Sequence, residues 1–169
     1  MEPIMKLIDP FLARKGTPGP PGVGRRLSID PGVRGTGWAL WSTTGFLLAC
    51  GLHEPPWEDI TRVAIEVPQV YRKSRVDPND LITLAFLAGR YVGKAQSLTG
   101  FTCEAKWCWP HEWKGDLDKD ITEARARKKL TADERLVVEE CERYVPRSLM
   151  NNVWDAIGIG LYAWRGGIS

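Results

Sequence analysis

Two short apolar segments of this chain each end in a carboxylate that is followed within two residues by proline. They are "LSIDP", which carries Asp30, and "VAIEVP", which carries Glu66. Proline has no N–H to give to a β ladder, so both segments are predicted to be strands that stop near their acid. "RVAIEV" is apolar and β-branched on both faces, which favours a central, buried strand. The two acids could therefore meet at one end of a sheet.

The segments around these two strands predict one mixed sheet. "GWALW" and "GFLLACGL" flank "STTG", in which Gly45 supplies the turn of a β-hairpin. A helix is predicted to begin with Asp77 as its N-cap and Pro78 at its first position, and its apolar residues follow the helical period to Ala95. "FTCEAKWC" predicts a fifth strand. A hairpin before a strand-helix-strand unit indicates the α/β class, with a mixed five-stranded sheet and flanking helices.

The rest of the chain is predicted to be helical. Pro110 is expected to open a loop, and charged helical sequence runs from about Ile121 to Tyr144, with a break near Thr131. The final segment, "SLMNNVWDAIGIGLYAW", predicts a mostly apolar helix with Ser148 as its N-cap.

Length and composition limit the architecture. A chain of 169 residues suits one domain. We expect residues 1–24, which include "GTPGPPGVG", to be a flexible Pro/Gly-rich tail, and residues 25–169 to form the domain. The sequence has neither an apolar run of about 18 residues nor a signal-like apolar core, which predicts a cytoplasmic protein without a membrane partner. The net charge of +2 does not by itself indicate nucleic acid, and the four cysteines lack zinc-ribbon spacing.

Three acids lie inside apolar elements: Asp30, Glu66 and Asp155 of the last helix. Each loses hydration on folding, and a buried carboxylate without a partner costs several kcal/mol or becomes protonated. Each acid could be satisfied separately, by an arginine such as Arg26 or Arg34 or by backbone amides. Alternatively, the three converge, and a divalent cation that prefers oxygen ligands balances their charge.

Three motifs in order, "IDPGVRGTGWAL", "AIEVP" with a basic loop and helix after it, and "NNVWDAIGIGLYAW", carry a family resemblance. Over residues 26 to 165 the chain resembles the RuvC-type Holliday junction resolvases, crossover junction endodeoxyribonucleases of the ribonuclease H-like superfamily. The resemblance implies a ribonuclease H-like fold and a homodimer. It also implies a nuclease that resolves four-way DNA junctions by paired symmetric nicks, with two Mg²⁺ ions, which Mn²⁺ can replace, and with no organic cofactor.

The resemblance assigns catalytic, metal-binding positions residue by residue. Asp30 matches the metal-bridging aspartate of the first strand, Glu66 the fourth-strand glutamate and Asp155 the aspartate of the last helix. Three residues before that aspartate the family has an acid or histidine, whereas this chain has Asn152. Asparagine can offer a neutral carbonyl oxygen to a metal but cannot act as a general base. Three carboxylates with Asn152 could still hold two ions, the second ion could bind weakly, or Asn151 could share the role. The short connection "HEPPWEDIT" also resembles the compact bacteriophage-type members, which suggests a viral protein working in the host cytoplasm.

Basic residues near the proposed metal site are candidate DNA contacts. The loop "VPQVYRKSRVDP" places cations around an aromatic residue, which suits phosphate contact and base stacking, and the family uses the corresponding loop to enter the junction centre. "WKGDLDKD" adds two lysines in a region where family members have basic residues near the cleaved phosphate. A solvated charged surface is the alternative for both segments. The candidate DNA-binding residues are Tyr71, Arg72, Lys73, Arg75, Lys114 and Lys119.

Tryptophan and glycine positions add two expectations. Seven tryptophans are expected to pack in the core, although those near the loop after the fifth strand could instead reach DNA; the seven are Trp38, Trp41, Trp107, Trp109, Trp113, Trp154 and Trp164. Gly89 and Gly93 would allow another helix to approach the long helix closely. That helix could belong to a second subunit, as in the family, or to the same chain.

Two other functions stay open at this point. The chain could be a related ribonuclease H-like nuclease that acts on other branched DNA or on RNA. It could also be a catalytically weakened junction-binding protein, with Asn152 as the sign of lost activity. An ATP-binding loop of the actin and sugar-kinase type is disfavoured, since that architecture needs two such domains.

Overall fold

The computed structural model describes residues 24–69, 77–115 and 117–168, and its strands form one mixed sheet. The strand order in the sheet is β3-β2-β1-β4-β5. The β3–β2 and β2–β1 pairs are antiparallel. The β1–β4 and β4–β5 pairs are parallel. The strands are β1 (Arg25–Asp30), β2 (Gly37–Trp41), β3 (Leu47–Leu52), β4 (Ile60–Glu66) and β5 (Glu104–Cys108). The predicted α/β class and five-stranded mixed sheet are confirmed.

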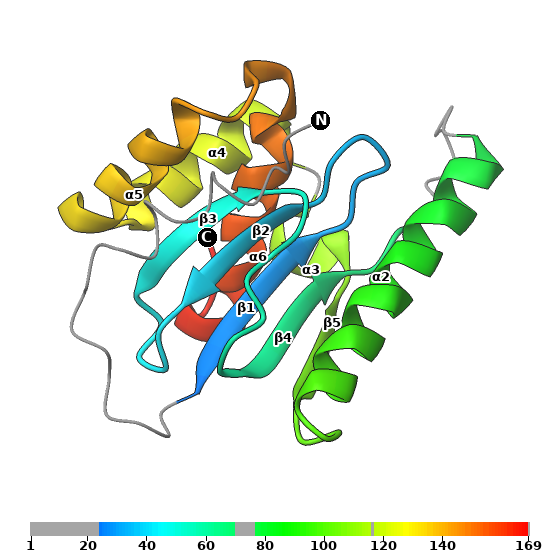
Figure 1. Cartoon of the computed structure of the whole chain (residues 1–169). Coiled ribbons are helices and arrows are strands. Elements are labelled where there is room, and N and C mark those ends of the chain that lie inside the picture. Colours follow the sequence, from blue (N-terminus) through cyan, green and yellow to red (C-terminus); the bar gives the residue numbers. More distant parts are fainter. Residues whose placement is uncertain (1–23, 70–76, 116, 169) are drawn as a thin grey trace, which may run out of the picture.

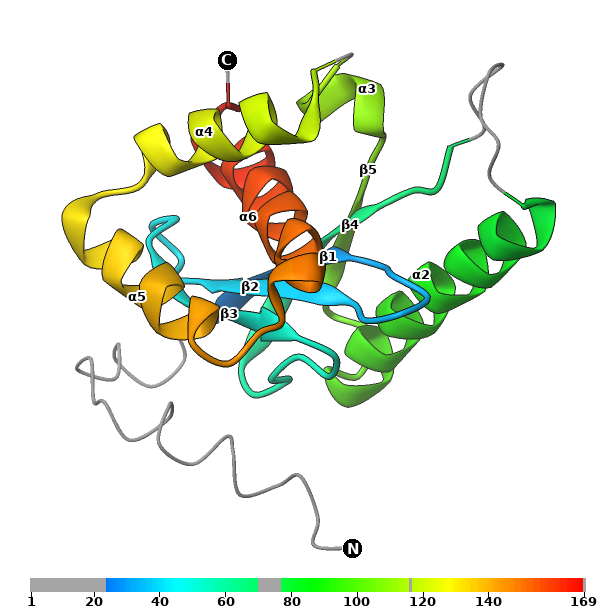
Figure 2. The ribbon, with the colours of Figure 1, turned by 90° about the horizontal axis from the view of Figure 1, so that it is seen from above.

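Helices cover both faces of this sheet, as the two views in Figures 1 and 2 show. One face is covered by the long helix α2, and the other by α4, α5 and α6. Their bounds are α2 (Pro78–Leu98), α3 (Pro110–Trp113), α4 (Lys119–Lys129), α5 (Ala132–Glu142) and α6 (Met150–Arg165), and the short 3-10 helix η2 (Arg147–Leu149) precedes α6. The strands thus have a hydrophobic cluster on each side, one packed against α2 and one against α6.

Small residues let α6 lie close to the central strands. The Ser28 hydroxyl of β1 donates to the Ala156 carbonyl of α6 at 2.7 Å and accepts from the Trp41 indole N–H at 2.8 Å. A Cβ at Gly160 would overlap that indole ring. Because the backbone of α6 packs directly against β1 and β2, its side chains have a defined position relative to the strand ends.

The far end of α6 is tied to the hairpin and to α5. Glu134 is fully buried, accepts from the backbone N–H of Leu47 at 2.6 Å and forms an ion pair with Arg165. Arg165 also donates to the Gly45 carbonyl at 2.7 Å. Burial opposes ionisation of Glu134, but Arg165 and the backbone donors outweigh it and lower its pKa. This network fixes the C-terminal end of α6 against the hairpin.

Several helix boundaries follow the sequence signals. Asp77 caps α2 by accepting from the Asn79 N–H at 2.8 Å. Thr131 separates α4 from α5 and forms a capping box with Glu134. The turn at Gly45 has the expected positive φ, 85°.

Two boundary predictions were wrong. Pro110 does not open a loop but begins the one-turn helix α3, where proline's fixed φ and missing N–H suit the first helical position. Ser148 does not cap the last helix, because η2 takes up residues Arg147–Leu149 and α6 begins at Met150.

The tryptophans divide between core and surface. Trp41, Trp113 and Trp154 are buried, and Trp38 and Trp164 are partly buried, as expected. Trp107 and Trp109 are 46% and 42% exposed, so core packing was the wrong prediction for these two. No helix in the described part of the chain is both long and apolar enough to span a bilayer.

Candidate active site

Asp30 and Glu66 lie side by side at the carboxyl ends of two neighbouring parallel strands. The register pairs Ile29 of β1 with Ile65 of β4, so the acids that follow them occupy equivalent positions. Side chains alternate along a strand, so Asp30 points to the same face as Ser28, which binds α6. Asp30 is 8% exposed. The predicted meeting of the two strand acids at one sheet end is therefore what the backbone produces.

Asp155 of α6 and Lys114, which directly follows α3, complete the group. The Lys114 Nζ lies 3.4 Å from Glu66 Oε2 and 3.3 Å from Asp155 Oδ2. The three side chains are 20%, 15% and 14% exposed, respectively. One ammonium therefore sits between carboxylates that come from β4 and α6, two elements far apart in the sequence.

Trp113 holds Glu66 from another direction. Its indole N–H donates to Glu66 Oε2 at 2.9 Å, and the Lys114 ammonium lies 4.6 Å from the centre of its ring. The ring fits because residue 158 of α6 is glycine, where a Cβ would overlap the indole. The sequence predicted that Trp113 packs in the core or contacts DNA, and it did not predict this hydrogen bond to Glu66. The glycine in the apolar helix was the available signal, since it leaves room for a large side chain.

The charges in this group shift two pKa values. Burial raises the pKa of Glu66, and the neighbouring Asp155 adds to the effect, while Lys114 and the Trp113 N–H oppose it. Burial alone would lower the pKa of Lys114, but the carboxylates of Glu66, Asp155 and Asp30 outweigh it and raise that pKa. Lys114 is therefore charged at neutral pH, and the three acids act on it together.

Asn152 lies one helical turn before Asp155, next to the connection between β1 and β2. Its side-chain amide donates to the Gly35 carbonyl at 2.5 Å. At Gly37, where β2 begins, a Cβ would overlap the Asn152 backbone carbonyl. The side-chain nitrogen of Asn152 thus binds backbone, and its carbonyl oxygen is the atom left to act as a ligand.

The donor chemistry of this group suits a hard divalent cation. Carboxylate oxygens are the ligands that Mg²⁺ and Mn²⁺ prefer, and two of them already share a single positive charge in the form of Lys114. Among the residues that the structure describes, however, no three His, Cys, Asp or Glu side chains are grouped closely enough to hold a metal ion. The type of the donor atoms suits a divalent cation, and the Lys114 ammonium occupies the space between the Glu66 and Asp155 carboxylates.

The candidate DNA-binding residues are only partly within the described structure. Tyr71, Arg72, Lys73 and Arg75 lie outside the described residues, between the end of β4 and the start of α2. Lys119 is the first residue of α4. Lys114 contacts the acids instead of standing free for a phosphate.

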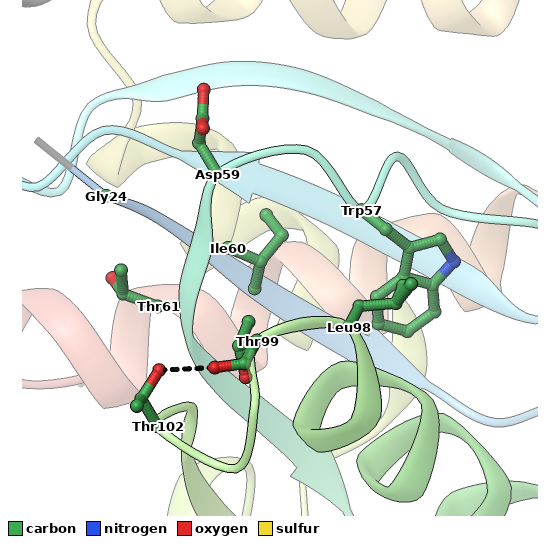
Figure 3. A pocket seen from close by; sticks show the side chains of 8 residues that line it. All are labelled: Gly24, Trp57, Asp59, Ile60, Thr61, Leu98, Thr99 and Thr102. Atoms are coloured by element: carbon green, nitrogen blue, oxygen red, sulfur yellow. Dashed lines mark hydrogen bonds between the residues drawn. The ribbon is translucent and has the colours of Figure 1, made fainter. Parts of the chain in front are cut away.

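A surface pocket of about 370 Å³ lies at the opposite end of the strands and is shown in Figure 3. It is formed where the end of α2 meets the start of β4, and Thr102 donates there to the Thr99 carbonyl at 2.8 Å. Among the described residues, Asp59 is the single charged side chain that lines it. These lining residues therefore include no pair of acids like that at the carboxyl edge of the sheet.

Comparison with known proteins gives a fold relationship. No family model matches the chain, and no curated protein matches it significantly. RuvC of Thermus thermophilus, solved in complex with a Holliday junction substrate, is similar at a TM-score of 0.54 and 20% identity, with 85% of this chain and 96% of that chain covered. A second T. thermophilus RuvC structure gives 0.51 and 18%, with 84% and 96% covered. The order of the strands, the helices on both faces and these neighbours agree: the chain has the ribonuclease H-like fold of the RuvC-type Holliday junction resolvases.

Proposed function

We propose that this protein is a metal-dependent, structure-selective endonuclease that resolves four-way DNA junctions by paired symmetric nicks. The observation that carries the proposal is that the carboxylates of Glu66 and Asp155 both contact the Lys114 ammonium, beside Asp30, at the carboxyl edge of the sheet. Support for the substrate comes from the similar fold of a RuvC that was solved with a Holliday junction. The short connection between β3 and β4 agrees with a bacteriophage-type member.

Asp30, Glu66 and Asp155 would hold the divalent ions, with the carbonyl oxygen of Asn152 as a further ligand. Two bound Mg²⁺ ions, or Mn²⁺ in their place, would activate the attacking water and stabilise the leaving oxygen. The chain's own residues then have defined tasks. Trp113 orients Glu66 through its indole N–H, and α6 fixes Asp155 through its backbone contacts with β1. Asn152 holds the β1–β2 connection that follows Asp30.

DNA would approach along this carboxyl edge. Phosphate contacts are proposed for Arg72, Lys73, Arg75 and Lys119, and Tyr71 is proposed to stack on a base at the junction centre. Lys114 could contact the phosphate next to the cleaved bond only after leaving the acids that it now binds.

A homodimer is proposed to form through the outer face of α2. Ile82 and Phe86, one turn apart, are 68% and 74% exposed, and the next turns carry Gly89 and Gly93. Apart from the adjoining backbone of α2 itself, a Cβ at either glycine would have no atom of the described residues within 4 Å, so packing among these residues does not explain the glycines. An apolar, small-residue helix face that none of the described residues covers suits a second copy of the same helix.

The dimer can be tested by replacing Phe86 with glutamate. Phe86→Glu should convert a dimer to a monomer in light scattering coupled to gel filtration, because a charge would be buried against its symmetry mate. Leu136→Glu is the matched control, since Leu136 is 61% exposed on α5, on the other side of the sheet. A dimer that survives Phe86→Glu would place the interface elsewhere.

The nuclease function is tested with three substrates: a synthetic four-way junction, a linear duplex and an RNA–DNA hybrid, each with Mg²⁺ or with EDTA. We expect metal-dependent, symmetric nicking of the junction and no nicking by Asp30→Asn. Asp59→Asn is the matched control, because Asp59 is an exposed acid at the other end of the strands whose φ of 57° asparagine also adopts. If the protein cleaves the RNA–DNA hybrid and leaves the junction intact, the alternative of a ribonuclease H-like nuclease that acts on RNA is favoured.

A second candidate function is junction binding without cleavage. It is favoured by Asn152, which has no charge and whose side-chain nitrogen binds the Gly35 carbonyl. In that case the protein would retard the four-way junction in a gel and leave both strands intact with Mg²⁺ or Mn²⁺.

A further inference from the structure

We propose that Lys114 is an internal counter-ion that holds the acidic site together in the metal-free protein and that a divalent cation must displace to bind. The inference rests on the proposed function only in assigning a metal to these acids. It adds a competitor for the metal within the same chain, and a conformational step, the departure of one side chain, before the site can be loaded.

The position of the ammonium is the first argument. Nζ lies between oxygens of Glu66 and Asp155, and Asp30 also acts on its charge. Mg²⁺ takes oxygen ligands at about 2.0–2.1 Å, so an ion shared by these two carboxylates needs the space that Nζ now fills. The ammonium and a shared ion are therefore mutually exclusive.

The strength of the Lys114 contacts is the second argument. At 3.3 and 3.4 Å they are longer than good charge-assisted hydrogen bonds, which are about 2.7–2.9 Å. The ammonium balances charge without tight coordination, and it carries one charge against the two carboxylates that it contacts. A doubly charged ion with short oxygen contacts would balance the acids better.

The third argument is that Lys114 has a way out. It caps α3 and is followed by Gly115, which has a positive φ of 59° and, leaving aside its chain neighbours, no atom of the described residues within 4 Å of a Cβ position. The side chain is already 20% exposed, and a lysine stem is long and flexible. The ammonium can therefore move toward solvent without changing the β-sheet.

The experiment measures metal binding and thermal unfolding of the DNA-free protein, in EDTA and in titrations with Mg²⁺ or Mn²⁺. In EDTA, Lys114→Met should lower the unfolding midpoint by roughly 5–10 °C, because the partly buried carboxylates of Glu66 and Asp155 lose their counter-ion. With metal, the same variant should regain this loss and bind the ion at least about tenfold more tightly than the unchanged protein, since no ammonium competes.

Two further variants provide the controls. Lys94→Met removes a lysine that also pairs with a glutamate and lies over a tryptophan ring, but far from the acids, and should leave metal affinity unchanged. Lys114→Arg keeps the charge in a side chain that grips carboxylates with two hydrogen bonds, and should bind metal no more tightly than the unchanged protein. Lys114→Arg also keeps the test decisive if Lys114→Met fails to fold.

Equal or weaker metal binding by Lys114→Met would overturn the proposal, as would tighter binding by Lys114→Arg. The readout needs no DNA, so it separates this inference from the proposed nuclease function. If Lys114 competes with the metal but the protein does not cleave the junction, the counter-ion inference stands and the proposed nuclease function is rejected. Junction cleavage with no competition would do the opposite.

Discussion

Two places in this molecule combine a glutamate, a tryptophan and a lysine in the same way. At the carboxyl edge of the sheet, the Trp113 indole N–H donates to Glu66, and Lys114 binds the same carboxylate while lying 4.6 Å from the ring centre. In the connection before β4, the Trp57 indole N–H donates to Glu54 at 2.5 Å. Lys94 of α2 pairs with Glu54 there and lies 5.3 Å from the Trp57 ring centre.

The two groups differ in burial and in the presence of further acids. Glu54 is 48% exposed at its side chain, and although burial opposes ionisation, Lys94 and Trp57 lower its pKa. Glu66 is 15% exposed, and burial together with Asp155 raises its pKa. The same three side chains thus stabilise a charge in one place and only partly offset its cost in the other. A local motif does not determine the charge state of its acid; the surroundings do.

The largest expected difference between the two groups is in catalysis. Glu66→Gln should lower metal-dependent junction nicking by more than about 100-fold, because the proposed metal ligand would lose its charge while keeping its shape. Glu54→Gln should stay within about twofold of the unchanged protein. Single-turnover nicking rates with saturating Mg²⁺ measure both. Similar rates for the two variants would mean that Glu66 is not a metal ligand.

A smaller difference is expected in stability when each tryptophan is replaced. Trp113→Phe should cost about 2 kcal/mol, since the partly buried Glu66 carboxylate loses a donor and the shorter ring leaves space beside Gly158. Trp57→Phe should cost less than about 1 kcal/mol, because solvent can replace its N–H and the ring can keep its stacking on Tyr91. Urea unfolding in EDTA gives both values, and equal costs would contradict the assigned difference in burial.

The smallest effects concern pH and have opposite signs. The pKa of Glu66 is raised in the folded protein, so its protonated form contributes stability below the ordinary pKa of 4.5. This contribution is lost as the pH rises through the folded pKa, so in EDTA ionised Glu66 lowers stability near pH 7. Glu66→Gln should therefore raise the unfolding midpoint by roughly 2–4 °C at pH 7, with no gain at pH 4.

Glu54 has a lowered pKa, so its contribution is present above the ordinary value of 4.5 and is lost as pH falls through the folded value. Glu54→Gln should lower the midpoint at pH 7 by no more than about 2 °C, and the loss should shrink as the pH falls through that value. Melting curves of both variants between pH 3 and 8 compare the signs directly. A gain at pH 7 for Glu54→Gln would remove the contrast between the two groups.

The backbone of the site could be predicted because it follows from local chemistry. Prolines after Asp30 and Glu66 mark strand ends, and neighbouring parallel strands bring such ends together. The apolar pattern of the last helix placed Asp155 on an element that had to pack on the sheet. Each step uses residues that are close in sequence, so no long-range information was needed.

The side-chain partners of the acids could not be predicted in the same way. Trp113 and Lys114 reach Glu66 from more than forty positions away, and the contact depends on Pro110 starting a helix and on Gly158 leaving room for the ring. Nearness in sequence favours Arg26 or Arg34 as partners of the acids. Arg26 instead lies over the Trp164 ring, at the other end of β1.

The contact between Asn152 and Gly35 has a consequence for attempts to redesign the protein. Replacing Asn152 with aspartate would add a carboxylate beside Asp30 and Asp155, but it would also remove a donor and set a carboxylate against a backbone carbonyl. The β1–β2 connection after Asp30 would then be pushed away from the start of α6. The site would gain a negative charge at position 152, but the position of Asp30 would become less well ordered. A successful redesign would change two positions at once, with a new donor for the Gly35 carbonyl introduced together with the acid.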